Sequence, residues 1–270
     1  MTAVLYIAAR APRPGFAKTR LGRAIGHVQA NALYTAFLQD LARRLALFPF
    51  PVGWYVTPPD AWDDLAQLVR PELLPPAGCQ HAFEKRQAVP NGVTPPALHG
   101  PVLTQGDGDW AARQQALFLD APARGETRTV LIASDSPQVS VEALREAFDL
   151  LATHDVVLGP VDDGGYYLIG MRGPWPLLGG VPMSTSTVLS EIVARARGLG
   201  LTVGFVEPTF DVDDDGDLAR LAEVAATRPD LVATRAALAE LGCQATASHA
   251  SAALPAGVGL AQAPCPLCPS

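Results

Sequence analysis

Short apolar runs alternate with segments of helical periodicity along most of this chain. The runs expected to form strands cover residues 4–9, 52–56, 129–133, 155–158, 166–171 and 202–206. The segments expected to be helical cover residues 27–48, 60–69, 108–120, 141–151, 185–199, 217–226 and 231–241. Strands that alternate with helices are typical of a mostly parallel sheet with helices on both faces. The sequence therefore predicts an α/β fold, in which ligands bind beyond the carboxyl ends of the strands.

The size and charge of the chain limit its partners. Its 270 residues suffice for one large α/β domain or two small ones. The formal net charge is -7 and no run rich in Lys and Arg occurs, so we do not expect a nucleic-acid polymer as a partner. No apolar run reaches the roughly 18 residues that a membrane span needs, and the first residues lack a signal-peptide pattern. We therefore expect a cytoplasmic protein.

Two stretches lack any periodicity. Residues 71–103 are rich in Pro, Gly and polar residues, which indicates a long loop. From residue 244 to 270 the chain is rich in Ala, Ser, Pro and Gly, which predicts a flexible tail. Cys265 and Cys268 in this tail have the CxxC spacing, but no second pair lies nearby, so the sequence favours incidental thiols over a zinc site.

The most informative motif joins the two strands expected at 155–158 and 166–171. It contains the adjacent carboxylates Asp162 and Asp163 and the adjacent glycines Gly164 and Gly165. Glycines let the backbone adopt positive φ and approach a ligand closely, and carboxylates suit a metal ion or the hydroxyl groups of a substrate. The alternative is a plain Asp-Gly hairpin turn. Tyr166, which follows, is expected either to stack on a base or sugar or to be a core tyrosine with a satisfied hydroxyl.

A basic loop follows the first expected strand. It carries the cations Arg10, Arg13, Lys18 and Arg20 around Gly15 and two prolines. A loop shaped by Gly and Pro can wrap a phosphate chain, and Lys or Arg can neutralise the phosphates. The loop lacks the spacing of a Walker A motif. The alternative is a solvated basic loop without a ligand.

Two acidic motifs follow other strands. Asp135 comes directly after the strand expected at 129–133, where a metal ligand or a helix cap would lie. The run 211–217 contains five aspartates, which repel one another unless they are solvated or bound to a cation. The middle of this run is expected to cap the next helix. Asp211 and Asp213 are therefore the better candidate metal ligands.

Together these motifs indicate one kind of chemistry. A divalent cation, Mg²⁺ or Mn²⁺, held by the carboxylates would neutralise a diphosphate, and the basic loop would stabilise the charge on the leaving group. This fits the transfer of a sugar from a nucleotide sugar, or of a nucleotidyl group from a nucleoside triphosphate. The five histidines are scattered without ligand spacing, so zinc chemistry is not expected. The four tryptophans, including Trp110, are predicted to be packing residues.

The motifs occur here in the order found in a known family. They are Lys18-Thr19-Arg20-Leu21, Ser134-Asp135-Ser136-Pro137, Gly159-Pro160-Val161-Asp162-Asp163-Gly164-Gly165-Tyr166-Tyr167, and Asp211-Val212-Asp213 followed by Asp217-Leu218. Between about residues 3 and 221 the sequence resembles the DUF2064 group of GT-A-type nucleotide-diphospho-sugar transferases, whose members are often labelled arsenosugar-biosynthesis-type glycosyltransferases.

The resemblance implies a fold, an activity and a division of roles. The fold would be a GT-A three-layer α/β/α sandwich with a Rossmann-like sheet, and the activity glycosyl transfer from a nucleotide-sugar donor to a small-molecule acceptor. The diphosphate would bind at Arg10, Gly15, Lys18, Arg20 and Arg113. The metal would bind at Asp135 with Asp213 or Asp211. Asp162 and Asp163 would position hydroxyl groups, one of them as a general base if the reaction inverts configuration, and Gly164, Gly165 and Tyr166 would contact the substrate.

Two departures from the family pattern and two other functions stay open. Residues 79–103 resemble an insertion in a single catalytic domain that covers residues 1–243. Ser184 follows Met183 where the family pattern leads us to expect Trp.

The first alternative function is a nucleotidyltransferase of the phospholactate guanylyltransferase type, which would release pyrophosphate. The second is an accessory protein that binds nucleotide sugars without turnover. The sequence does not specify the base, the sugar, the acceptor or the oligomeric state.

Overall fold

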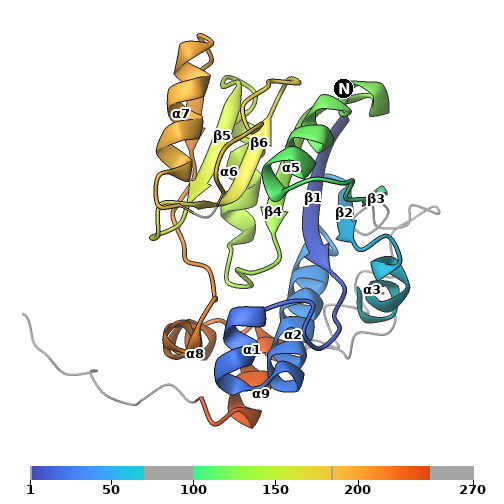
Figure 1. Cartoon of the computed structure of the whole chain (residues 1–270), viewed down its shortest axis with the longest axis vertical. Coiled ribbons are helices and arrows are strands. Elements are labelled where there is room, and N and C mark those ends of the chain that lie inside the picture. Colours follow the sequence, from blue (N-terminus) through green and yellow to red (C-terminus); the bar gives the residue numbers. More distant parts are fainter. Residues whose placement is uncertain (1, 70–99, 184, 244–270) are drawn as a thin grey trace, which may run out of the picture.

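The computed structural model describes residues 2–69, 100–183 and 185–243, and its centre is a seven-stranded sheet (Figure 1). The strands stand in the order β3-β2-β1-β4-β6-β5-β7. Their bounds are β1 (Thr2–Arg10), β2 (Val52–Thr57), β3 (Val102–Thr104), β4 (Glu126–Ala133), β5 (Val156–Pro160), β6 (Tyr166–Met171) and β7 (Val203–Phe205). Only β6 runs antiparallel to its neighbours, β4 and β5. The predicted mostly parallel sheet is confirmed.

Helices cover both faces of this sheet, as the sequence predicts. The helices are α1 (Thr19–Ile25), α2 (His27–Leu45), α3 (Ala61–Val69), α5 (Trp110–Leu119), α6 (Val141–Leu150), α7 (Val188–Gly198), α8 (Asp215–Thr227) and α9 (Val232–Glu240). Leu5 and Ile7 of β1 belong to a core shared with α2, α3, α6, α8 and α9, whereas Val4 and Tyr6 belong to a second core with α5 and α7. Because side chains alternate along a strand, one apolar run supplies both cores. The result is a three-layer α/β/α sandwich.

Three elements differ from the prediction. Helix α1 begins at the end of the predicted loop 10–20 and continues through residues to which the sequence assigns no element, and it contains Gly22, which weakens a helical pattern. Strand β3 falls at the end of the predicted loop 71–103 and pairs in parallel with β2 through only three residues. It also includes the last part of the predicted insertion 79–103. The remainder of that insertion, and the predicted tail 244–270 with Cys265 and Cys268, lie outside the described residues.

The topology brings several loops to one edge of the sheet. Strands β1, β2, β3 and β4 are mutually parallel, so their carboxyl ends share that edge. Strand β6 runs the opposite way, so its first residue, Tyr166, lies at the same edge. The basic loop after β1, Asp135 after β4 and the turn before β6 therefore meet, although more than 100 residues separate the first from the others. No helix in the described part of the chain has the length and apolarity that crossing a bilayer requires.

Candidate active site

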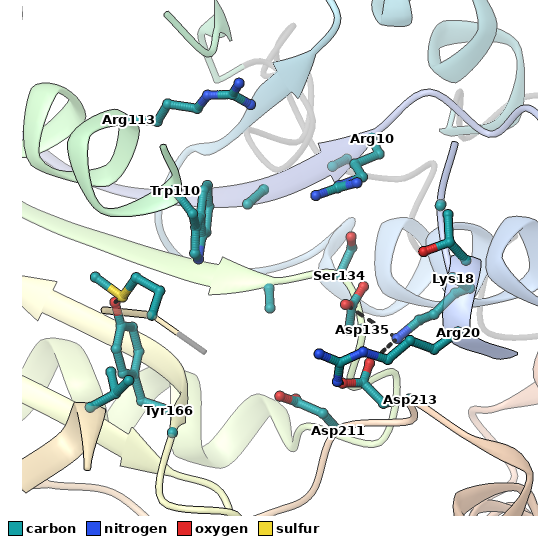
Figure 2. Close-up of a pocket in the computed structure, with 18 of the residues that line it drawn as sticks. Arg10, Lys18, Arg20, Trp110, Arg113, Ser134, Asp135, Tyr166, Asp211 and Asp213 are labelled. Atoms are coloured by element: carbon teal, nitrogen blue, oxygen red, sulfur yellow. Dashed lines mark hydrogen bonds and ion pairs between the residues drawn. The ribbon is translucent and has the colours of Figure 1, made fainter. Parts of the chain in front are cut away.

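A cleft of about 610 Å³ opens at the carboxyl edge of the sheet (Figure 2). Its walls come from the loops after β1, β3 and β4, from the turn before β6, and from Met183, Thr185, Ser186, Val188, Asp211 and Asp213. Ten of the thirteen residues that the sequence predicts for the site line this cleft. They are Arg10, Lys18, Arg20, Arg113, Asp135, Asp163, Gly165, Tyr166, Asp211 and Asp213. A concave site at this edge is where ligands bind in open α/β sheets.

Lys18 is the best-contacted cation of the cleft. Its Nζ donates to the carbonyl oxygen of Val212 at 2.7 Å. It also lies 3.2 Å from Oδ2 of Asp135 and 3.6 Å from Oδ1 of Asp213. The side chain is only 2% exposed. Lys18 thus links the loop after β1 to both acidic motifs, as the dashed lines in Figure 2 show.

The backbone of the basic loop sets this position. Lys18 precedes α1 and has φ 50° and ψ 44°, the left-handed region that residues other than Gly rarely adopt. The loop is held from outside by Arg13, whose guanidinium pairs with Asp60 at 3.0 Å and Asp64 at 2.6 Å. Arg13 therefore anchors the loop to the start of α3, and it takes no place in the lining of the cleft.

The other predicted phosphate ligands lie in different environments. Arg10, at the end of β1, lines the cleft and donates through Nη1 to the carbonyl oxygen of Phe16 at 3.3 Å. Arg20, 73% exposed at the side chain, lies 3.5 Å from Oδ2 of Asp213. Arg113 of α5 donates through Nε to the carbonyl oxygen of Gly108. Gly15 is exposed and does not line the cleft, so the structure does not bring it to the other candidates.

The acidic side chains differ in burial. Asp211 accepts a hydrogen bond from the Ser136 hydroxyl at 2.6 Å. Burial raises the pKa of Asp211 to about 6, and the nearby charges of Asp135 and Asp213 act in the same direction, whereas the Ser136 hydrogen bond and Lys18 oppose them. Asp135 and Asp213 are more exposed and face the ammonium of Lys18.

The rest of the 211–217 run has a structural role, as the sequence predicts for its middle part. The Asp214 side chain caps α8 by accepting from the backbone N–H groups of Gly216 and Asp217. The Asp217 side chain in turn accepts from the backbone N–H groups of Asp213 and Asp214, which completes a capping box. This cap fixes the backbone that carries Asp213 toward Lys18.

The residues present fit a divalent cation that binds together with a substrate. Within residues 2–69, 100–183 and 185–243, no group of three or more His, Cys, Asp or Glu side chains is arranged to hold a metal by itself. Carboxylate oxygens of Asp135 and Asp213 nevertheless converge on one cationic group, the Lys18 ammonium. Mg²⁺ commonly takes only one or two carboxylates and completes its shell with water and substrate phosphates. The pair is sufficient for that mode.

The two aspartates of the turn between β5 and β6 diverge. Asp163 lines the cleft, and its Oδ1 accepts from the backbone N–H of Gly165 at 2.9 Å. Asp162 instead pairs with Arg220 of α8 at 2.5 Å, and both of these side chains are exposed. The structure therefore does not bring Asp162 to the cleft, contrary to the predicted shared role, because neighbouring residues of a tight turn point in different directions.

The two glycines of this turn also differ. Gly164 has φ +88°, and a Cβ added to it would lie 2.0 Å from the backbone oxygen of Ser186. Its positive φ and its close neighbour thus belong to the packing of the turn against residues before α7, and Gly164 does not line the cleft. Gly165 does line it. Of the two glycines, only Gly165 therefore lies where the predicted ligand contact would be made.

Tyr166 lies both at the cleft, where a ligand could stack on it, and against the core, where its hydroxyl is satisfied. It lines the cleft, yet it packs against the core beneath α5 and α7. Its hydroxyl donates to Oε1 of Gln114 at 3.0 Å. Burial raises the pKa of this hydroxyl, so Tyr166 stays protonated where it lines the cleft.

Three residues that line the cleft, Trp110, Tyr34 and Ser134, are not among the site residues predicted from the sequence. Trp110, predicted to be a packing residue, is 37% exposed at the first turn of α5. In the view of Figure 2, Trp110 and Tyr166 lie on one side and the charged cluster on the other. Tyr34 and Ser134 are buried under the cleft and joined by a hydrogen bond of 2.9 Å between their oxygens. The polar run 105–109 before Trp110 was the available signal, because Asp109 caps α5 and places the indole at the opening.

Comparison with known proteins supports the fold and part of the resemblance. Residues 77–185 match the family model described as "Uncharacterized protein conserved in bacteria (DUF2064)". No curated protein matches the chain. The crystal structure of a "putative nucleotide-diphospho-sugar transferase" from Desulfovibrio desulfuricans G20 has 27% sequence identity and a TM-score of 0.70, and the match covers 89% of this chain and 95% of that one. A cytidylyltransferase from Leptospira borgpetersenii serovar Hardjo-bovis has 13% identity and a TM-score of 0.47, over 89% and 92% of the two chains.

The match to the Desulfovibrio protein covers most of this chain, whereas the family model covers a shorter segment. The DUF2064 segment includes β4, β5 and β6, and with them Asp135 and the Asp-Asp-Gly-Gly turn. These comparisons do not show the arsenosugar-type group. Residues 77–185 are thus similar to the DUF2064 family, and the fold of the chain matches that of the putative nucleotide-diphospho-sugar transferase.

Proposed function

We propose that this protein is a metal-dependent glycosyltransferase that moves a sugar from a nucleotide-diphosphate sugar to a small-molecule acceptor. The observation that carries the proposal is the convergence of Lys18, Asp135 and Asp213 in a cleft that Arg10 and Arg20 also line. Carboxylates for a divalent cation and cations for phosphates are the two groups that a diphosphate leaving group requires. The fold shared with the Desulfovibrio protein supports the same class.

The donor side of the cleft consists of the charged cluster. Asp135 and Asp213 would hold Mg²⁺ or Mn²⁺, which supplies positive charge to the leaving diphosphate when it is bound. Arg10, Arg20 and Lys18 would bind the phosphate oxygens, since guanidinium and ammonium groups form charge-assisted hydrogen bonds with phosphate. Asp211, half-buried at the cleft wall and bonded to Ser136, would orient the segment that carries Asp213.

The acceptor side consists of the turn before β6 and the wall beside it. The N–H of Gly165 fixes one oxygen of Asp163, so the carboxylate is oriented before a substrate arrives. Asp163 would position an acceptor hydroxyl, and in an inverting reaction it would take the proton of that hydroxyl. Tyr166 and Trp110 provide aromatic surface on which a sugar ring or a base can lie.

A specific observation also favours nucleotidyl transfer as the second candidate. Four cationic side chains, Arg10, Lys18, Arg20 and Arg113, line one cleft. A nucleoside triphosphate carries one phosphate more than a nucleotide sugar and would use this positive charge more fully. In that case the product would be pyrophosphate, and a phosphorylated small molecule would be the acceptor.

A turnover screen tests the proposal. The protein would be incubated with Mg²⁺ or Mn²⁺, a mixed pool of acceptors, and either nucleotide sugars or nucleoside triphosphates. Release of nucleoside diphosphate from a nucleotide sugar is the expected result, and it would identify the donor. Release of pyrophosphate would assign the protein to the nucleotidyltransferases instead. If nucleotide binding occurred without release of either product under any acceptor, the protein would be an accessory binding protein and the proposal would be wrong.

A further inference from the structure

The ammonium of Lys18 has the surroundings of a bound cation. Its three neighbours are a carboxylate oxygen of Asp135, a carboxylate oxygen of Asp213 and the carbonyl oxygen of Val212. A lysine ammonium has three donors, and three oxygens surround this one. Carboxylate and carbonyl oxygens are also the ligands that Mg²⁺ and Mn²⁺ prefer. The lysine therefore occupies the place between the two carboxylates where a divalent cation would lie.

The backbone conformation of Lys18 indicates that the surrounding structure holds this residue in place. Lys18 is the only non-glycine residue with positive φ in the described ranges of the chain. Such a conformation is costly and persists only where the surroundings determine it, which is common at functional sites. Burial of the side chain to 2% exposure leaves the ammonium little solvent to replace its oxygen neighbours. The three contacts thus hold the ammonium in the cluster. It can move away only when another anionic group replaces these contacts.

Arg20 provides a contrast within the same cluster. Its guanidinium also contacts Asp213, at 3.5 Å, but the side chain is 73% exposed. Among the ion pairs of the described residues, Arg20 pairs with Asp213, whereas Lys18 pairs with both Asp135 and Asp213. Arg20 and Lys18 carry the same charge, so a comparison of the two separates occupation of the site from a general effect of nearby positive charge.

We propose that Lys18 is a resident cation that keeps divalent metal out of the site until phosphate draws its ammonium away. This inference rests on the proposed function, because Asp135 and Asp213 are its metal ligands. Two cations cannot share the same oxygens at short distance, since their repulsion is strong in a partly buried site. Metal therefore binds weakly to the free protein and tightly only together with a phosphate-bearing substrate, whose oxygens replace the carboxylates around the lysine.

The test measures the binding of Mn²⁺ alone, without nucleotide, by the loss of the electron paramagnetic resonance signal of free Mn²⁺. The proteins are the wild type, Lys18→Met, and Arg20→Met as the matched control that removes the same charge. Lys18→Gln serves as a second variant because its amide retains a hydrogen-bond donor if the methionine variant does not fold, and circular dichroism and thermal melting check folding. Asp135→Asn in the Lys18→Met background shows whether the Mn²⁺ occupies the predicted position.

We expect Lys18→Met and Lys18→Gln to bind Mn²⁺ at least about tenfold more tightly than the wild type. Arg20→Met should change the affinity by less than about threefold, and Asp135→Asn should abolish the gain. Equal affinities of the wild type and both Lys18 variants, or an equal gain in Arg20→Met, would overturn the inference and leave the metal-dependent transferase intact. If no variant bound Mn²⁺, and nucleotide sugars turned over equally well in the presence of a chelator, the proposed metal site itself would be wrong.

Discussion

Replacement of Gly164 by alanine tests how the Asp-Asp-Gly-Gly turn is built. The φ of +88° costs an L-residue about 1–2 kcal/mol. The new Cβ would lie 2.0 Å from the backbone oxygen of Ser186, so the turn and the segment before α7 must separate. That movement weakens the hydrogen bond from the N–H of Leu189 to the carbonyl oxygen of Gly164, now 3.0 Å long, at a cost of about 1 kcal/mol. We expect the free energy of unfolding to fall by about 2–4 kcal/mol.

Gly165→Ala is the matched control, one residue further along the same turn. Its φ is not positive, and an added Cβ would meet only side-chain atoms, Oδ1 of Asp163 at 3.1 Å and Cγ2 of Val161 at 3.2 Å. These atoms can shift by a few tenths of an ångström, so we expect a loss within about 1 kcal/mol.

Urea unfolding and calorimetry of both variants provide the measurement. In a domain of this size, a loss of 1 kcal/mol lowers Tm by about 2–4 °C, so Gly164→Ala should melt about 5–15 °C below the wild type. A Tm of Gly164→Ala within about 2 °C of that of Gly165→Ala would refute the reasoning. It would mean that the contact with Ser186 relaxes without cost and that Gly164 is free for another role.

Three further predictions concern single side chains. Asp230 forms ion pairs with Arg44 and Arg228, and the hydrogen bond from Arg228 lowers the pKa of Asp230 to about 2. Because this pKa is lowered on folding, the ionised carboxylate stabilises the fold above about pH 4, and that stabilisation is lost as the pH falls from about 4 to about 2. In urea unfolding, Asp230→Asn should therefore reduce the free energy of unfolding by about 1 kcal/mol less at the low end of this range than at pH 7, a figure that allows for the partial exposure of the side chains. Asp162→Asn should change turnover by less than about twofold, whereas Asp163→Asn should reduce kcat by about 100-fold or more. Trp110→Ala should raise KM by about tenfold while Tm changes little, since the indole is partly exposed; an unchanged KM would remove the indole from the binding surface.

The long elements of the fold could be predicted because the local sequence determines them. The apolar runs of β1 and β4 are buried on both faces, and the helical period of α2 extends over 19 residues. Helix α1 and strand β3 could not be predicted in this way, because their formation depends on partners distant in sequence. Strand β3 contributes three residues to the edge beside β2, and α1 packs against α2 and against α8, which lies almost 200 residues further along the chain.

The site could be predicted as a set of motifs but not as a geometry. Lys18, Asp135 and Asp213 stand in three separate motifs, and the rule that ligands bind at the carboxyl edge of the sheet brings them together. The sequence could not show that the ammonium of Lys18 lies between the two carboxylates, because that depends on one left-handed residue. Nor could it distinguish Asp162 from Asp163, since a turn directs adjacent side chains apart. The exposure of Trp110 likewise depends on its place at the first turn of α5.

The central claim is that Asp135 and Asp213 hold a divalent cation that binds together with the nucleotide. The most direct measurement is isothermal titration calorimetry of the wild type and Asp135→Asn with nucleoside diphosphates, in Mn²⁺ and in excess chelator. The account predicts that Mn²⁺ strengthens binding to the wild type by about tenfold or more and has no effect on Asp135→Asn. Equal affinities of the wild type with and without Mn²⁺, or an equal gain in both proteins, would contradict it.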